Sequence, residues 1–166
     1  SREVAALSDV IITMVTDTPD VRQVVLGENG VLSGIRPGAL IIDMSTISPR
    51  ATREIAAAVR EKGADFLDAP VSGGEGGAIA GTLSIMVGGQ EDTFAASLPI
   101  LQAMGKNIIH VGGTGAGQLT KLCNQIAVAI TNLAMSEALI FGEKAGIDLE
   151  KMHQAISRGA AGSWKL

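Results

Sequence analysis

Cysteine is almost absent from this sequence, since Cys123 is the only one among 166 residues. A single thiol cannot form a disulfide within the chain, and a lack of disulfides is typical of proteins from reducing compartments. The neighbours of Cys123, Leu122 and Asn124, provide no metal-ligand spacing. We therefore predict a cytoplasmic protein without a metal site, in which Cys123 is a buried, inert thiol.

Clusters of positive charge are also lacking. The net charge is −4, and no segment gathers the Lys and Arg residues that binding to nucleic acid or to an anionic membrane requires. Residues 1–7 contain neither a long apolar run nor a signal cleavage site, so we expect no secretory signal there. Hydrophobic residues make up 46% of the chain, enough to build a core. We expect a soluble, globular protein whose partner is a small molecule.

What the sequence does contain is a regular alternation of short β-branched runs and amphipathic stretches, up to about residue 113. This alternation is typical of βαβ units on a mostly parallel sheet. Strands are predicted at Val10–Val15, Leu40–Met44, Asp65–Asp68, Leu83–Val87 and Ile108–Val111. Helices are predicted from Pro19, from Pro49 with Ser48 as its cap, over Glu75–Ala80 and over Asp92–Met104. Residues 1–113 are thus predicted to form a Rossmann-type α/β domain.

A much longer helix is predicted from Gly115 to Ala145, where Gly146 ends it. Its middle is apolar on nearly all sides, as in a membrane span or a buried helix. Polar residues interrupt it too often for a span, namely Asn124, Gln125, Thr131, Asn132, Ser136 and Glu137. We predict that this helix is buried between domains or subunits and that it assembles a homo-oligomer. Residues 114–166 are predicted to begin an all-α domain. Its second helix is predicted at Leu149–Ser157, with Asp148 as the cap.

The glycine-rich loop Gly112–Gly117 follows a strand and opens a helix, as a dinucleotide-binding fingerprint would. Thr120 replaces the third glycine of that fingerprint, and the acidic residue about twenty positions further on, Glu137, lies inside the long helix. We interpret the loop as a flexible joint that allows close approach of backbone and ligand. A nucleotide-binding module built on this loop remains an alternative.

Lys121 stands in the first turns of the long apolar helix and shares one helix face with Asn124 and Gln125. Burial there would lower the pKa of the lysine and make it a usable proton donor. The alternative is an ordinary solvated lysine. His110 and His153 have no acid or nucleophile nearby in the sequence, so we expect surface or packing roles for them.

Two further groups of residues are candidates for ligand binding. The segment from Asp68 to Gly77 is dense in glycine, and consecutive amides in such a loop can hold a carboxylate, although a tight turn is the alternative. The residues after the first two strands, Val15–Asp17 and Asp43–Thr46, follow the carboxyl ends of parallel strands, where ligands bind in open sheets. Capping of the following helices is the alternative role for these residues.

These segments together resemble the 3-hydroxyisobutyrate dehydrogenase, or β-hydroxyacid dehydrogenase, family. The resemblance rests on Asp68–Gly74, on Gly81–Gly89 and on the Gly115-x-Gly-x-x-x-Lys121-x-x-Asn124 pattern, and it covers essentially the whole chain. Within the family, Val25–Gly30 and Met135–Ala138 most resemble the tartronate semialdehyde reductase branch. The resemblance implies NAD- or NADP-dependent reduction of a small semialdehyde acid, tartronate semialdehyde to glycerate, or the reverse oxidation of a 3-hydroxy acid such as 3-hydroxyisobutyrate.

The resemblance also implies roles for individual residues. Lys121 would be the catalytic general acid and base. The substrate carboxylate would be held by Ser72, Gly73 and Gly74, and Asn124 would bind the substrate or orient the lysine. The nicotinamide half of the cofactor would be lined by Val15, Thr16 and Thr46. Many relatives have Leu-Pro in place of Val15-Thr16, so single cofactor contacts would differ from theirs.

The family pattern begins with a strand and a glycine-rich phosphate loop that this sequence does not contain, and it continues beyond the second helix of the all-α domain. We therefore expect an incomplete Rossmann-type domain that is inactive by itself. A non-catalytic relative that binds small carboxylates is the alternative function.

Overall fold

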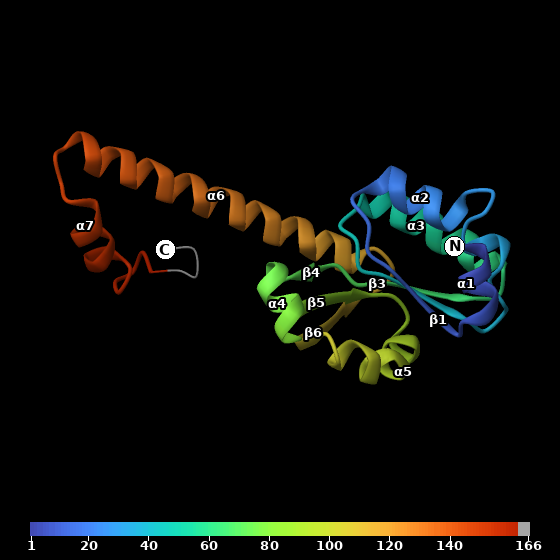
Figure 1. The fold of residues 1–166 in the computed structure, drawn as a ribbon. Coiled ribbons are helices and arrows are strands. Elements are labelled where there is room, and N and C mark those ends of the chain that lie inside the picture. The colour runs from blue at the N-terminus through green and yellow to red at the C-terminus, as the bar shows by residue number, and fades with distance from the viewer. Residues whose placement is uncertain (163–166) are drawn as a thin grey trace. The chain divides into compact units, whose positions relative to one another are not determined.

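The computed structural model of the chain describes residues 1–162 and divides them into two compact units, residues 1–122 and the residues from Cys123 onward (Figure 1). The first unit contains α1 (Arg2–Leu7), β1 (Val10–Thr13), α2 (Thr18–Leu26), the 3-10 helix η1 (Val31–Ser33), β2 (Leu40–Asp43), α3 (Pro49–Glu61), β3 (Asp65–Asp68), β4 (Val71–Ser72), α4 (Gly74–Ala80), β5 (Leu83–Gly88), α5 (Glu91–Gln102) and β6 (Gly105–Gly112). Helix α6 (Ala116–Lys144) begins in this unit and ends in the second, which also contains α7 (Leu149–Ile156). The α-helical part, predicted to reach Leu166, is described as far as Gly162.

The sheet has six strands in two parallel blocks. Strands β1, β2 and β3 are parallel neighbours, and β5 and β6 form a second parallel pair. Strands β3 and β4 both pair antiparallel with β5, so that Asp68, Val71 and Ser72 lie opposite Gly88, Ile85 and Ser84. The predicted α/β class and mostly parallel sheet are therefore confirmed, whereas the two-residue strand β4 and the reversal at β5 were not predicted.

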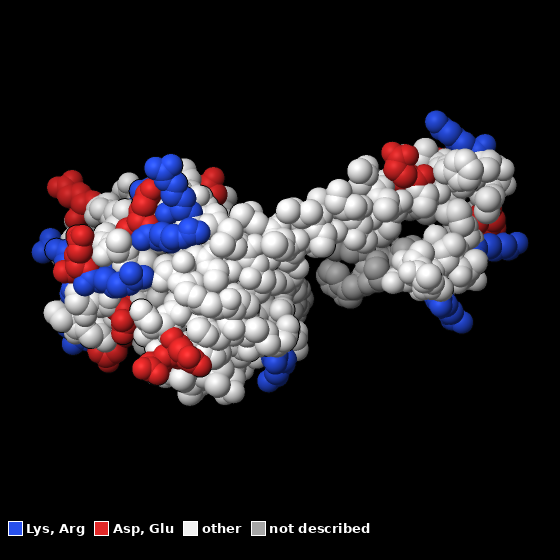
Figure 2. Space-filling model, turned by 180° about the vertical axis from the view of Figure 1, so that it is seen from behind, with Lys and Arg blue, Asp and Glu red and all other residues white. Residues whose placement is uncertain are grey.

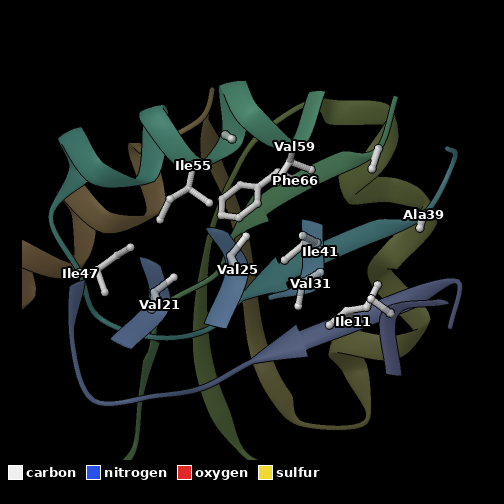
Figure 3. Close-up of a cluster of buried hydrophobic side chains, with 13 residues drawn as sticks. Ile11, Val21, Val25, Val31, Ala39, Ile41, Ile47, Ile55, Val59 and Phe66 are labelled. Atoms are coloured by element: carbon white, nitrogen blue, oxygen red, sulfur yellow. The ribbon is translucent and has the colours of Figure 1, made fainter. Parts of the chain in front are cut away.

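The core of the first unit follows from the alternation of side chains along the strands. Ile41 and Phe66 face α2 and α3, while their neighbours Ile42 and Leu67 belong to a second cluster that Leu101 of α5 completes. Figure 3 shows the first cluster between these helices and strands β1 to β3. Each such side chain, once buried, contributes about 1.5–3 kcal/mol to stability, and this packing fixes the strand ends that carry the candidate site.

Helix starts agree with the capping signals in the sequence. The side chain of Ser48 accepts a hydrogen bond from the Ala51 amide, and Pro49 occupies the first turn of α3. Asp148 likewise accepts hydrogen bonds from the amides of Glu150 and Lys151 at the start of α7. Both predicted caps are confirmed.

Helix α6 spans 29 residues, as predicted, but it is not buried in the described chain. It is long and apolar enough to cross a membrane by length and composition alone, with a mean hydropathy of 1.4 in an 18-residue window of which 6% is buried. Figure 2 shows no charged side chain along its middle, where residues 122–136 contain no Lys, Arg, Asp or Glu. The predicted burial of Cys123 is wrong. This thiol is exposed because the tightly packed part of α6 ends at Lys121.

Candidate active site

The carboxyl ends of β1, β2 and β3 bring three polar side chains together. Thr13, Asp43 and Asp68 are register partners across the two parallel ladders, and all three are buried. The Thr13 hydroxyl donates to Asp43 Oδ1 at 2.9 Å, while Asp43 Oδ2 is buried without a partner in the described residues. Desolvation raises the pKa of both carboxyl groups, and the charge of Asp43 adds to the effect on Asp68. Asp43 and Asp68 thus form a pair of adjacent buried acids at the carboxyl ends of β2 and β3.

Ser45 joins the loops that follow β1 and β2. Its hydroxyl oxygen accepts a hydrogen bond from the Val15 amide at 2.9 Å, and its own amide donates to Asp43 Oδ1 at 3.2 Å. The bond to Ser45 replaces strand pairing at Val15, which is why β1 ends at Thr13, before the predicted end. Val15 is half-buried, whereas Thr16 and Thr46 are exposed. The predicted cofactor-lining residues therefore lie on two linked loops.

Helix α6 begins directly against Asp68. This carboxylate accepts hydrogen bonds from the amides of Gly115 at 2.7 Å and Gln118 at 3.0 Å. At Gly117 a Cβ atom would lie 2.4 Å from the carbonyl oxygen of Met86, so only glycine permits this approach. This close packing joins Gly117 to the sheet, and the approach of a ligand to the loop stays a prediction. Because Asp68 already binds these amides, they are not available to a phosphate, which argues against the nucleotide-binding alternative.

Sequence reasoning missed Gln118, a fully buried residue in the first turn of α6. Its Oε1 accepts a hydrogen bond from the Ile47 amide at 3.0 Å, and its Nε2 donates to the Ser45 carbonyl at 2.7 Å. The signal in the sequence was an amide side chain at the start of a very apolar helix, but its partners lie more than 70 residues away.

Lys121 follows one turn after Gln118 and is 8% exposed. Desolvation lowers the pKa of its ammonium group. Within residues 1–162 this group has no hydrogen-bond or ion-pair partner. A lysine in this state gives up its proton more readily than a solvated one, and its neutral amine form is populated at lower pH. The environment predicted for Lys121 is therefore present.

The glycine-rich segment after β3 adopts a backbone that other residues would resist. Ser72 ends β4 and is half-buried, and the next two residues, Gly73 and Gly74, have φ angles of +140° and +63°. Both glycines are exposed at the surface of the first unit. Consecutive amides in such a conformation can form a concave anion site.

The remaining candidates lie elsewhere. Asn124 belongs to the second unit, is half-buried and donates through Nδ2 to Gln125 Oε1 at 3.0 Å. His110 stacks on Phe94 with ring centroids 5.1 Å apart, which agrees with a packing role. Among the described residues there is no group of three or more His, Cys, Asp and Glu side chains arranged to hold a metal ion.

Comparison with known families matches both parts of the chain. Residues 1–112 match the NAD binding domain of 6-phosphogluconate dehydrogenase, and residues 115–166 match the NAD-binding region of NADP-dependent 3-hydroxyisobutyrate dehydrogenase.

Individual relatives agree with these matches. The 2-hydroxy-3-oxopropionate reductase of Escherichia coli K12 is 52% identical over 98% of this chain and 56% of its own length. The 3-hydroxyisobutyrate dehydrogenase of Pseudomonas aeruginosa is 42% identical over 96% of this chain and 53% of its own length. A structure of Mycobacterium tuberculosis 3-hydroxyisobutyrate dehydrogenase with L-serine superposes with a TM-score of 0.89 at 40% identity, over 99% of this chain and 56% of that one. The chain thus spans about half the length of the relatives it matches.

Proposed function

This chain belongs to the β-hydroxyacid dehydrogenase family, and from that premise we propose that its enzyme moves hydride between NAD or NADP and a small hydroxy or semialdehyde acid. The observation that carries the proposal is the buried ammonium of Lys121, which has no partner within residues 1–162. It lies one turn away from Gln118, whose side chain binds the loop after β2. In the direction of reduction, this ammonium gives its proton to the carbonyl oxygen of the substrate. In the direction of oxidation, the neutral amine takes the proton from the hydroxyl.

The nicotinamide cofactor would supply the hydride, and three residues fit its binding. Val15, Thr16 and Thr46 stand beyond the carboxyl ends of two adjacent parallel strands, where open α/β sheets bind ligands. Ser45 holds both loops in place through the Val15 amide, so these residues can line a rigid surface. NAD and NADP are both compatible with this part of the site.

The carboxylate of the substrate would be bound by the hydroxyl of Ser72 and the amides of Gly73 and Gly74. Their positive φ angles favour a concave arrangement of amides, which is suited to an anion. Asn124, three residues beyond Lys121 on α6, would hydrogen-bond the substrate or orient the lysine.

Among possible substrates we propose tartronate semialdehyde, which would be reduced to glycerate. The support is the 52% identity to 2-hydroxy-3-oxopropionate reductase. Oxidation of 3-hydroxyisobutyrate is the second candidate, and the 42% identity to a dehydrogenase with that name supports it.

The test is oxidation of NADH and NADPH by the full-length enzyme with tartronate semialdehyde or methylmalonate semialdehyde. We expect turnover with one of the two aldehydes, and its loss in Lys121→Ala. Lys106→Ala, which removes an exposed lysine of β6, is the matched control and should keep wild-type rates. No turnover, or turnover that survives in Lys121→Ala, would replace this function with non-catalytic carboxylate binding.

We also propose that a second copy of the enzyme covers helix α6. Ile126, Ile130 and Leu133 recur at helical spacing along one side of the helix, and each is at least 57% exposed. An apolar stripe of this length needs a protein partner, and two-fold association of identical helices would provide one.

A cytoplasmic location stays a prediction.

A further inference from the structure

A continuous path of hydrogen bonds links the loop after β1 to the start of α6. The Val15 amide donates to the Ser45 hydroxyl, the Ser45 carbonyl accepts from Gln118 Nε2, and the Gln118 amide donates to Asp68. Ile47 adds a parallel connection through its amide, which donates to Gln118 Oε1. Ser45 and Gln118 therefore fasten both cofactor-lining loops to one helical turn.

The side chain of Gln118 is matched to this place on both of its polar atoms. Burying an amide without hydrogen-bond partners is unfavourable, because its polar atoms lose their bonds to water. Gln118 avoids that cost because its oxygen and nitrogen bind the Ile47 amide and the Ser45 carbonyl of the same loop. These two backbone groups flank Thr46, which lies between them and is exposed. An apolar side chain of similar length would fill the space but leave both groups of the loop unpaired.

The turn that carries Gln118 has little freedom to move by other means. Gly117 packs so closely on the sheet that a Cβ atom there would lie 2.6 Å from the Asp68 carbonyl oxygen. Asp68 itself binds the amides on either side, those of Gly115 and Gln118. Lys121 stands three residues further along, on the same side of α6 as Gln118. The position of the lysine therefore follows this turn, which Asp68 and Gly117 attach to the sheet and Gln118 attaches to the loop around Thr46.

We propose that Gln118 is a positioning residue, which holds the proton-donating Lys121 in register with the nicotinamide side of the site by joining the first turn of α6 to Ser45 and Ile47. The proposal rests on the proposed dehydrogenase function. As a consequence, the loop that lines the cofactor and the helix that carries the proton donor are held together by the same side chain. A displacement of about 1 Å at the donor can cost on the order of 100-fold in rate.

The test compares Gln118→Met with wild type in the full-length enzyme. Methionine keeps the length and volume of glutamine but loses both hydrogen bonds. We expect kcat to fall roughly 10-fold to 100-fold, with a smaller change in the KM values for cofactor and aldehyde. The rate of oxidation rises with pH as Lys121 loses its proton, and this rise should move to higher pH in Gln118→Met. The reason is that a loosened turn admits water to the ammonium, which raises the pKa of Lys121. Gln102→Met, an exposed position at the end of α5, is the matched control.

A second variant covers the case in which Gln118→Met does not fold. Gln118→Glu is nearly isosteric, and its neutral form can accept from Ile47 and donate to Ser45, whereas its ionised form cannot donate. We expect the kcat of Gln118→Glu, relative to wild type, to recover as the pH is lowered. A role limited to filling space would give no such recovery.

Amide hydrogen exchange provides a readout that needs no turnover. In Gln118→Met, exchange at Ile47 and over residues 115–121 should be faster than in wild type, while exchange in β5 stays unchanged. The positioning role would be overturned if Gln118→Met kept the wild-type kcat and the wild-type pH dependence of oxidation. Unchanged exchange at Ile47 would overturn it as well. If instead Lys121→Ala stays active, the dehydrogenase mechanism fails, and faster exchange at Ile47 would then establish Gln118 as a structural link alone.

Discussion

The carboxyl groups of Asp43 and Asp68 end neighbouring parallel strands as register partners, and both side chains are fully buried. Asp68 uses its two oxygens to bind amides at the start of α6, whereas Oδ2 of Asp43 has no hydrogen-bond partner among residues 1–162. A buried pair of acids at this position makes the stability of the first unit depend on pH.

Lowering the pH should stabilise the fold through this pair. Desolvation raises the folded-state pKa of both acids, so their protonated forms are favoured in the folded protein. The stabilisation is complete below the unfolded-state pKa of about 3.9 and is lost as the pH rises through the raised folded-state values. Asp43→Asn removes one acid, and with it the charge that adds to the effect of desolvation in raising the pKa of Asp68. Urea unfolding between pH 4 and pH 7 should show a flatter dependence in this variant, and an unchanged slope would contradict the assignment.

Gly117→Ala should destabilise the enzyme by about 1–3 kcal/mol, because the new Cβ atom would meet carbonyl oxygens of Met86 and Asp68 at 2.4 and 2.6 Å. Gly113→Ala is the matched control, since a Cβ atom there has no neighbour within 4 Å. Its stability should stay within about 0.5 kcal/mol of wild type. Chemical denaturation measures both, and equal effects of the two substitutions would argue against close packing at Gly117.

The elements around this joint show how far sequence reasoning reaches. Strand β3 was predicted with its observed bounds, and the caps Ser48 and Asp148 were predicted from local signals alone. Lys121 was found because its environment follows from its own helix. Gln118 was missed because its role depends on a loop 71 residues away in the sequence. Cys123 was misplaced because hydrophobic composition does not tell where the packed part of a long helix ends.

Catalysis should depend on pH in opposite ways in the two directions. Burial lowers the pKa of Lys121 from its ordinary value. Reduction needs the ammonium form, so its rate should fall as the pH rises through that pKa, while the rate of oxidation should rise over the same range. Pre-steady-state rates of hydride transfer between pH 6 and pH 10 measure this. If the same pH dependence of the two rates persisted in Lys121→Ala, the titrating group would be another residue.

Ser72→Ala should weaken substrate binding with less effect on kcat. A hydrogen bond to a carboxylate is worth about 1.5–3 kcal/mol, which corresponds to a rise in KM of roughly 10-fold to 100-fold. Ser8→Ala, at an equally half-buried position after α1, is the control. Steady-state kinetics with the preferred aldehyde checks this, and a KM for Ser72→Ala equal to that of the control would remove Ser72 from the carboxylate site.

Ile130→Glu should disrupt the proposed homo-oligomer, because it places a charge in the middle of the apolar stripe of α6, at a residue that is 61% exposed. Ala138→Glu adds the same charge at an exposed position outside the stripe and should keep the oligomer. Sedimentation of the full-length enzyme and both variants measures the assembly. A wild-type enzyme that sediments as a monomer would exclude a second copy as the partner of α6.

The place where the chain is divided depends on the criterion, and the difference matters for building chimeras. The two family matches meet between Gly112 and Gly115, whereas packing divides the chain after Leu122. A chimera joined at the glycine loop would separate Asp68 and Ser45 from the helical turn that binds them, and the incoming helix would have to reproduce both Gly117 and Gln118. A crossover after Leu122 keeps every one of these bonds within a single parent, so enzymes recombined there should retain their proton donor in place.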